Sequence, residues 1–174
     1  MASNFTIFNV LTSSIFLAPD RCKEPVDPGV GSGPKVLMFN FDTTLGMCLN
    51  FYYNGQAGND NRFFDLYSCL DTCTDKYAKR CPLGNNPISF VKCTTHKNCH
   101  DEKVYYCSVQ GVCCKNTDLE EAKKAFNPTC SSPIRFHYRG TMRLLIGKSC
   151  DIPFCPEDSK CLTNPFFAYC CKNE

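Results

Sequence analysis

Two short apolar runs separated by a polar turn stand out in the first third of the chain. Residues 36–41 (VLMFNF) and 48–53 (CLNFYY) are rich in residue types that favour extended strands. Between them, residues 42–46 (DTTLG) carry the aspartate and glycine that are typical of turns. The pattern therefore predicts a β-hairpin over residues 36–53.

A short helix is predicted to follow this hairpin. Asp65 is a suitable N-cap, and Cys69 and Cys73 are four residues apart, so a helix would place both sulfurs on one face. A unit of this size buries little apolar surface, and covalent cross-links are the usual compensation.

Residues 117–128 (TDLEEAKKAFNP) predict a second helix. Thr117 and Glu120 match a capping box, Glu120 and Lys124 have the spacing of a stabilising ion pair, and Pro128 ends the segment. The apolar face of this helix is expected to pack on a neighbouring unit rather than to bind a partner. Its residues are Leu119, Ala122 and Phe126.

A further hairpin is predicted over residues 134–146 (IRFHYRGTMRLLI), which alternate in polarity and turn at Gly140-Thr141. Its basic residues are Arg135, His137 and Arg139 on one face, with Arg143 and Lys148 nearby. A basic strip on such a module can bind a sulfated polysaccharide. The alternative is an ordinary solvated strand face.

Composition changes the picture through its cysteines. Sixteen cysteines among 174 residues indicate a disulfide scaffold made in an oxidising compartment, and an even count allows all of them to pair. A net charge of +2 with no long basic run gives no indication of nucleic-acid binding. We therefore expect a secreted, extracellular protein.

The cysteines after residue 80 fall into two similar sets of six, in residues 81–114 and 130–171. Each set ends in an adjacent pair, and each unit has a Pro-Ile-x-Phe motif early, which indicates an internal repeat. Six cysteines allow fifteen connectivities, and the sequence does not choose among them. The cysteines are Cys81, Cys93, Cys99, Cys107, Cys113 and Cys114 in the first unit, and Cys130, Cys150, Cys155, Cys161, Cys170 and Cys171 in the second.

The N-terminal residues 1–21 have an apolar middle and small residues near Ala18, which suggests a secretory signal. They lack a positively charged start, so an N-terminal extension that is retained in the mature chain is the alternative. The segment is too short and too polar to span a bilayer, and no membrane span is expected.

The stretch from Cys22 to Cys73 carries a pattern of fixed gaps. Three residues separate Phe51 from the Gly55-Gln56 pair, six more lead to Phe63, five to Cys69 and three to Cys73. This spacing resembles the Kunitz (pancreatic trypsin inhibitor) signature, except that the family has a cysteine where this chain has Gln56. The residues at the family's core positions are Phe39, Phe41, Phe51, Tyr53, Gly55, Asn61 and Phe63.

The resemblance implies a small disulfide-rich α+β fold with a β-hairpin and a short C-terminal helix. It also implies the bridges Cys22–Cys73 and Cys48–Cys69, each of which would stabilise the fold by roughly 2–4 kcal/mol. The two later units resemble the lustrin-type cysteine-rich repeats that accompany Kunitz domains in roundworm extracellular proteins, through their adjacent cysteines and the Cys81-Pro82-x-Gly84 opening. The expected organisation is thus a segment 1–21, a Kunitz-type domain 22–73, and two disulfide-rich β-hairpin repeats, 81–114 and 130–171.

Kunitz proteins block serine proteases with a rigid loop, so the resemblance implies a serine protease as partner. The residue after the family's second cysteine fills the specificity pocket, and a bridge between the second and fourth cysteines clamps the loop. Here the second position falls on Gly31 when counted from Cys22, or on Ser32 when counted from Cys48, and the fourth is Gln56. Without that bridge, residues 29–34 are expected to gain backbone freedom that binding must remove.

The chemistry of this loop argues against tight inhibition of trypsin-like enzymes. The pocket-filling residue is Ser32 or Gly33, and neither offers a positive charge or apolar bulk. In the second register Pro34 would follow the scissile bond, and Lys35 lies beyond the site. An elastase-like enzyme, which accepts small side chains, is less strongly excluded. A non-inhibitory extracellular matrix or protein-binding module is the alternative function, and a channel-blocking toxin has no support beyond the fold.

No catalytic residue, cofactor or metal is predicted, and the chain is not expected to be an enzyme. It has no recognisable nucleophile–base pair, paired-carboxylate motif, phosphate loop or dinucleotide fingerprint. Cys93, His96, Cys99 and His100 have the ligand types of a zinc site. Disulfides are the preferred interpretation of these cysteines, because the second unit has no corresponding histidines.

Overall fold

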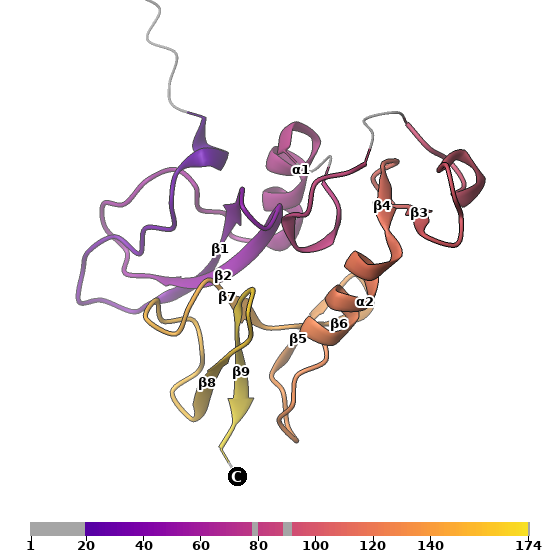
Figure 1. Cartoon of the computed structure of the whole chain (residues 1–174). Helices are drawn as coiled ribbons and strands as arrows, with labels where there is room; N and C mark the ends of the chain where they lie inside the picture. The colour runs from indigo at the N-terminus through magenta and orange to yellow at the C-terminus, as the bar shows by residue number, and fades with distance from the viewer. Residues whose placement is uncertain (1–19, 78–79, 89–91, 174) are drawn as a thin grey trace, which may run out of the picture.

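The computed structural model describes residues 20–77, 80–88 and 92–173 (Figure 1). Nearly all of the expected signal or extension therefore lies outside the described residues. A short 3₁₀ turn, η1 (Arg21–Lys23), lies near the start of the described residues and carries the buried Cys22. Among the described residues, no helix has both the length and the apolar character needed to cross a bilayer.

The predicted hairpin is formed by β1 (Val36–Asp42) and β2 (Met47–Tyr53), which pair antiparallel with Phe39 opposite Asn50. Asp42 closes its turn, because its Oδ1 accepts hydrogen bonds of 2.9 Å from the backbone N–H groups of both Thr44 and Leu45. This local bonding is the reason that the DTTLG sequence turns the chain there.

The predicted helix is α1 (Leu66–Tyr77), and Asp65 caps it. The Asp65 carboxylate accepts hydrogen bonds from the Ser68 backbone N–H at 2.9 Å and from the Ser68 hydroxyl at 2.8 Å. These bonds stabilise the charged carboxylate and lower the pKa of Asp65 below its ordinary value. The helix is linked to the rest of the unit by two bridges, Cys22–Cys73 and Cys48–Cys69.

The core of residues 22–73 gathers between the hairpin and α1. Asn61 is fully buried inside this unit: its Nδ2 donates to the carbonyls of Phe41 and Glu24, and its Oδ1 accepts from the Phe41 N–H at 2.9 Å. A buried amide that is fully satisfied in this way ties the strand to the loop before it. The cluster consists of Cys22, Phe39, Phe41, Cys48, Phe63, Cys69 and Cys73.

The first cysteine-rich unit (81–114) has little regular structure, whereas the second (130–171) is built of strands. The first contains η2 (Pro82–Gly84), η3 (His96–Asn98), β3 (Tyr105–Cys107) and β4 (Cys113–Lys115). The second contains β5 (Arg135–Tyr138), β6 (Thr141–Leu144), β7 (Ile146–Gly147), β8 (Ser159–Thr163) and β9 (Ala168–Lys172).

The two units share one disulfide connectivity. The first cysteine of each pairs with the sixth, the second with the fourth, and the third with the fifth. Successive residues of a strand point to opposite faces, so each adjacent pair binds two different segments of the chain. The bridges are Cys81–Cys114, Cys93–Cys107 and Cys99–Cys113 in the first unit, and Cys130–Cys171, Cys150–Cys161 and Cys155–Cys170 in the second.

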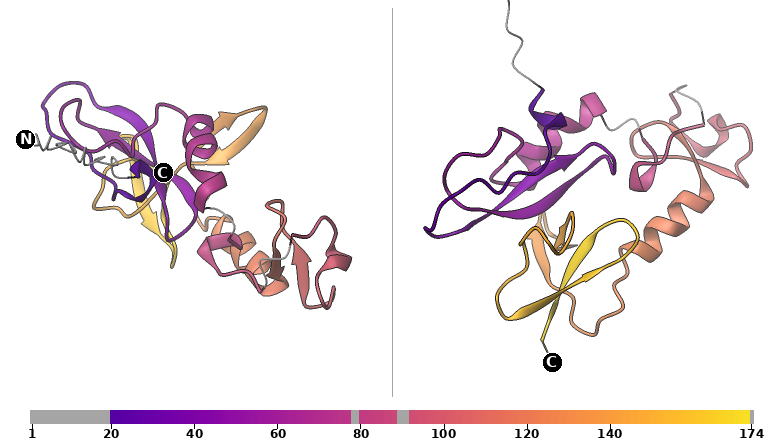
Figure 2. Two further views of the ribbon diagram at one scale, coloured as in Figure 1. Left: turned by 90° about the horizontal axis from the view of Figure 1, so that it is seen from above. Right: turned by 60° about the vertical axis from the view of Figure 1, so that its left-hand side comes forward.

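Strand pairing joins the second unit to the N-terminal hairpin. A five-stranded sheet has the order β1-β2-β7-β9-β8, in which β7 runs parallel to β2 with Asn50 beside Gly147. Figure 2 shows the hairpin β1–β2 and the strands β8–β9 side by side, with the first cysteine-rich unit set apart. Residues far apart in sequence thus form one sheet.

The second predicted helix is α2 (Asn116–Ala125), and it begins two residues earlier than a Thr117 cap would place it, because its cap is Lys115. The predicted capping box is wrong, because the carboxylate of Asp118 accepts the hydrogen bond from the Lys115 N–H at 3.2 Å. Glu120 pairs with Lys123 at 2.7 Å, and not with Lys124 as predicted.

The expected packing role of this helix is confirmed. Ala122 and Ala125 are buried in the largest apolar cluster, and the ring of Phe126 lies 5.0 Å from that of Phe167 in the second unit. The helix therefore connects the two cysteine-rich units through apolar contact as well as through the chain.

Candidate functional site

The segment that should carry inhibitory function, residues 29–35, lies at the surface of the N-terminal unit. Every residue from Val30 to Lys35 is exposed. Beside it runs the edge formed by residues 53–57, which follows β2 and contains Gln56, the residue that stands in place of the family's fourth cysteine.

Main-chain hydrogen bonds anchor the base of this loop. The Val30 N–H donates to the Gln56 carbonyl at 2.8 Å, and the Gln56 N–H donates to the Val30 carbonyl at 3.0 Å. The Asn54 N–H donates to the Pro28 carbonyl at 2.9 Å, and the Asn54 side chain donates to the Gly29 carbonyl at 3.0 Å. The expectation that residues 29–34 gain backbone freedom without the bridge is therefore wrong for Gly29 and Val30, because these hydrogen bonds link them to residues 54–56.

Two glycines make this close approach possible. A Cβ on Gly29 would lie 2.3 Å from the Gln56 carbonyl oxygen, and one on Gly31 would lie 2.3 Å from the Asn54 carbonyl oxygen. Both glycines also have φ values, +65° and +132°, that L-residues with side chains rarely adopt. By contrast, a Cβ on Gly33 would meet no heavy atom of the described residues within 4 Å.

The same geometry helps to choose between Gly31 and Ser32 as the residue at the family's second cysteine position. A Cβ on Gly31 would lie 3.9 Å from Cγ of Gln56. Gly31 therefore faces the residue at the family's fourth cysteine position, which favours the register that makes Ser32 the pocket-filling residue. Pro34 then lies two positions beyond Ser32, and Lys35 three.

A second set of contacts supports residues 53–59, and no local pattern in the sequence indicates it. The Arg62 guanidinium lies 4.7 Å from the centre of the Tyr53 ring and donates to the carbonyls of Ala57 and Asn59, both at 2.8 Å. The Tyr53 hydroxyl also donates to the Ala57 carbonyl at 2.8 Å. Arg62 thus holds residues 53–59 in place behind the loop.

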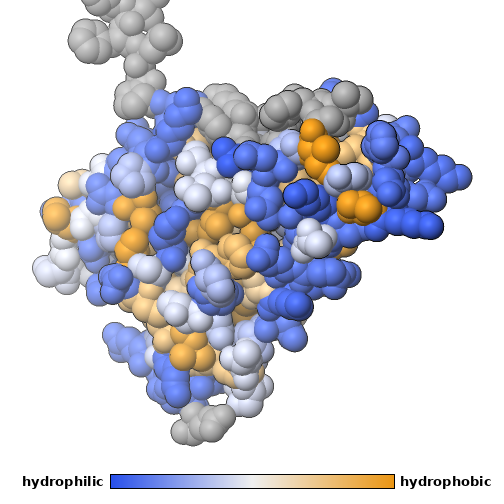
Figure 3. All heavy atoms as spheres, in the orientation of Figure 1, coloured by the Kyte–Doolittle hydropathy of each residue, from blue (hydrophilic) through white to orange (hydrophobic). Residues whose placement is uncertain are grey.

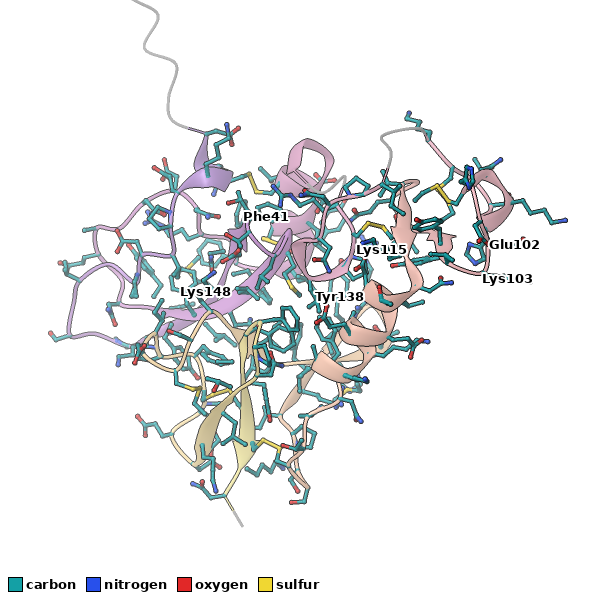
Figure 4. The ribbon with its side chains drawn as sticks, viewed as in Figure 1. Phe41, Glu102, Lys103, Lys115, Tyr138 and Lys148 are labelled. Atoms are coloured by element: carbon teal, nitrogen blue, oxygen red, sulfur yellow. A yellow bond between two sulfur atoms is a disulfide. The ribbon has the colours of Figure 1, made fainter. Side chains whose placement is uncertain are left out.

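The predicted basic strip is divided by the fold. Strands β5 and β6 form the expected hairpin, and Arg143 is opposite Phe136, so it faces away from Arg135 and His137. The guanidinium of Arg139 lies 4.5 Å from the ring of Tyr67 in α1. Lys148 binds Asp42 at 2.6 Å, beside the N-terminal hairpin (Figure 4).

The cysteines considered for zinc are bonded to other cysteines. The sulfurs of Cys93, Cys99 and Cys113 lie within 4.8 Å of one another, but Cys93 is bridged to Cys107 and Cys99 to Cys113. A disulfide sulfur is not a thiolate, which is the form that zinc binds. His96 lies apart from this chemistry, since its Nδ1 accepts a hydrogen bond from the Cys107 N–H at 3.0 Å.

Comparison with known proteins places this arrangement in a family. Residues 21–74 match the Kunitz/bovine pancreatic trypsin inhibitor domain. The major allergen Ani s 1 of Anisakis simplex is 33% identical, and the alignment covers 94% of each chain. A BPTI/Kunitz inhibitor domain-containing protein of Caenorhabditis elegans is 28% identical over 95% of this chain and 99% of its own length. The chain belongs to the Kunitz/bovine pancreatic trypsin inhibitor family.

A solved structure is similar to about a third of the chain. Conkunitzin-S1, a Kunitz-fold cone snail neurotoxin, is 36% identical over 32% of this chain and 96% of its own, with a TM-score of 0.30. The two roundworm proteins, in contrast, are similar along almost the whole chain. Domains of this family are of the protease-inhibitor type and are not enzymes.

Proposed function

We propose that the chain is a secreted Kunitz-family protein whose anchored loop 29–35 presents Ser32 to a serine protease with a small specificity pocket. The four hydrogen bonds between residues 28–30 and 54–56 carry this proposal. They pre-form the base of the loop, so less conformational entropy is lost when a protease binds it. A small serine side chain suits an elastase-like pocket and offers nothing to a pocket that selects basic residues.

Three further parts of the proposal rest on other observations. Secretion is supported by the pairing of all sixteen cysteines in eight bridges. A division into domains 22–73, 81–114 and 130–171 is supported by the position of the family match and by the shared connectivity of the last two units. The proposed partner class is supported by relatives such as the uterine plasmin/trypsin inhibitor of Sus scrofa, which is 37% identical over 44% of this chain.

A second candidate function is an extracellular protein-binding module that inhibits no protease. It is favoured by the tip of the loop, where Ser32, Gly33 and Pro34 are all exposed and Gly33 has open space around it. A tip of this kind can be cut by a protease rather than resist it.

Titration of elastase, chymotrypsin and trypsin with the disulfide-intact chain separates the two functions. Stoichiometric inhibition of elastase with an intact loop, as judged by mass spectrometry, is the result expected of an inhibitor. Cleavage between residues 31 and 35 without inhibition of any of the three enzymes would instead assign the binding-module function.

Substitutions at the tip test the register at the same time. Ser32→Arg should create inhibition of trypsin, because trypsin-like pockets reward a positive charge. Gly33→Arg is the matched control, and it should not create inhibition. If Gly33→Arg inhibits and Ser32→Arg does not, the register inferred from Gly31 and Gln56 is wrong.

A further inference from the structure

A cavity of about 400 Å³ lies where the N-terminal unit meets both cysteine-rich units. One wall is the face of α1 that carries Leu66, Leu70 and Thr74, which are four residues apart and so lie on one side of the helix. Another wall comes from the β5–β6 hairpin, where Phe136 packs on Phe39 with ring centres 5.8 Å apart. No unit forms this cavity by itself.

Most of the lining is apolar, but two buried polar atoms are left without partners. Asn50 is 2% exposed, and its Nδ2 has no hydrogen-bond partner among the described residues. The Thr74 hydroxyl is also buried and without a partner in the same part of the chain. Both residues line the cavity. Because a buried, unsatisfied polar group costs free energy, such atoms in an apolar cavity indicate a place for a polar ligand group.

One cation completes the lining. Arg143 is opposite Phe136 in the β5–β6 register, so its side chain lies on the cavity-facing side of the hairpin, and it is exposed to solvent at the cavity. It is the one charged residue among the described residues that line the cavity. The charge therefore favours an anionic ligand group.

We propose that this cavity binds a small lipophilic carboxylic acid. Arg143 and the Nδ2 of Asn50 donate to its carboxylate, and its hydrocarbon part lies against the apolar walls. The Thr74 hydroxyl supplies a further donor or acceptor. A volume of about 400 Å³ is in the range of small-molecule sites, which are typically apolar with a few placed polar groups. Hydrophobic residues gather at the centre of the face shown in Figure 3, where the hairpin β1–β2, the C-terminal strands and α2 meet.

The binding test uses the full, disulfide-intact chain and a fluorescent acid, 11-(dansylamino)undecanoic acid. We expect its emission to rise and shift to the blue on addition of the protein, and we expect decanoate to displace it. The neutral analogue decanol should compete at least roughly tenfold less well, because it lacks the charge that Arg143 binds. No change in emission, or equal competition by decanol and decanoate, overturns the proposal.

Variants locate the site. Arg143→Met keeps the alkyl contact and should weaken decanoate binding roughly tenfold, with little effect on decanol. Arg135→Met is the matched control, since it removes an arginine from the opposite face of the same hairpin and should leave both affinities unchanged. Asn50→Leu should also weaken decanoate binding without lowering the thermal unfolding temperature. Equal effects of Arg143→Met and Arg135→Met, or decanoate binding unaffected by both Arg143→Met and Asn50→Leu, would refute the site.

Discussion

The two cysteine-rich units have the same disulfide connectivity but differ in the buried side chains that pack around their bridges. In each, the fourth cysteine lies opposite the fifth in a hairpin, Cys107 opposite Cys113 and Cys161 opposite Cys170. The clusters of the first unit consist of cysteines and the buried Val112, and Tyr105 and Tyr106 pack against them partly buried. The second unit encloses Leu144, Leu145, Ile146, Phe154, Phe167 and Tyr169.

This difference shows how disulfides can compensate for a small apolar core. The first unit has too few apolar side chains to offset the entropy of ordering its loops, so its bridges must restrict the unfolded chain instead. The second unit adds the burial of large side chains and the strand pairing of β7 with β2. The folded structure of the first unit should therefore depend on its disulfides much more strongly than that of the second unit.

Removing the outer bridge of each unit should give the largest effect. Both Cys81→Ala/Cys114→Ala and Cys130→Ala/Cys171→Ala should lose about 4 kcal/mol of stability, because each bridge closes a loop of several tens of residues. Amide hydrogen exchange should show the first unit unfolding as a whole in the first variant, but only local loss of protection in the second. Equal protection of both units in the two variants would contradict the proposed difference in how strongly the units depend on their disulfides.

The junction of the second unit with the N-terminal hairpin is the next most sensitive place. A Cβ on Gly147 would lie 2.4 Å from Cδ1 of Phe154, a ring that is 1% exposed. Gly147→Ala should therefore destabilise the chain by about 2 kcal/mol, the usual effect of overpacking, as measured by denaturant unfolding. Gly33→Ala is the control, with an expected change close to zero. A Gly147→Ala variant of unchanged stability would show that the sheet β2–β7–β9 can shift to make room for the added methyl group.

In the first unit, Tyr106 should give an effect of the opposite sign. Its hydroxyl is buried without a partner among the described residues, so Tyr106→Phe should be neutral or should stabilise the unit by about 1 kcal/mol. Burial and the charge of Asp118 raise the pKa of Tyr106 above its ordinary value of 10.0.

The raised pKa sets the pH range of this effect. Since the folded pKa exceeds the unfolded one, the stability linked to the protonated hydroxyl is present below about pH 10 and is lost as the pH rises through the folded pKa. Unfolding curves recorded at increasing alkaline pH should show this loss in the parent and a smaller one in Tyr106→Phe. If the parent and Tyr106→Phe lose the same stability as the pH rises, the loss does not come from the Tyr106 hydroxyl.

The ion pair between the second unit and the N-terminal hairpin should contribute least. Lys148 and Asp42 are 2.6 Å apart, with side chains that are 40% and 10% exposed. Lys148→Met should cost less than about 1 kcal/mol, and the difference should shrink as salt is added. A cost that is large or independent of salt would mean that this pair, and not the sheet, holds the units together.

The local elements followed directly from the sequence. The hairpin of residues 36–53, the helix after Asp65 and the hairpin of residues 134–146 depend on strand-forming runs, turn residues and a cap, all of which act over a few residues. The second helix was predicted, but its start was not. The helix begins directly after Lys115, at the end of the preceding strand, and Asp118 accepts the hydrogen bond from the Lys115 N–H.

The candidate site was predicted less completely. The sequence located residues 29–35 and the substitution at Gln56, and it led to the expectation of an unclamped loop. It could not show that Gly29 and Gly31 let the loop approach residues 54–56, nor that Arg62 stacks on Tyr53 behind that edge. Both depend on contacts between residues that are 9 to 27 positions apart in the sequence, and no local pattern predicts such contacts.

By itself, the sequence determined the hairpins of residues 36–53 and 134–146, the presence of the two helices, the number of cysteines available and the kinship of residues 22–73. Tertiary structure alone decided which of fifteen pairings each unit adopts, the parallel contact of β7 with β2, and the cavity between the three units. The physical reason is range: propensity, turns and caps act within a few residues, whereas pairing and packing depend on which distant faces can be buried together.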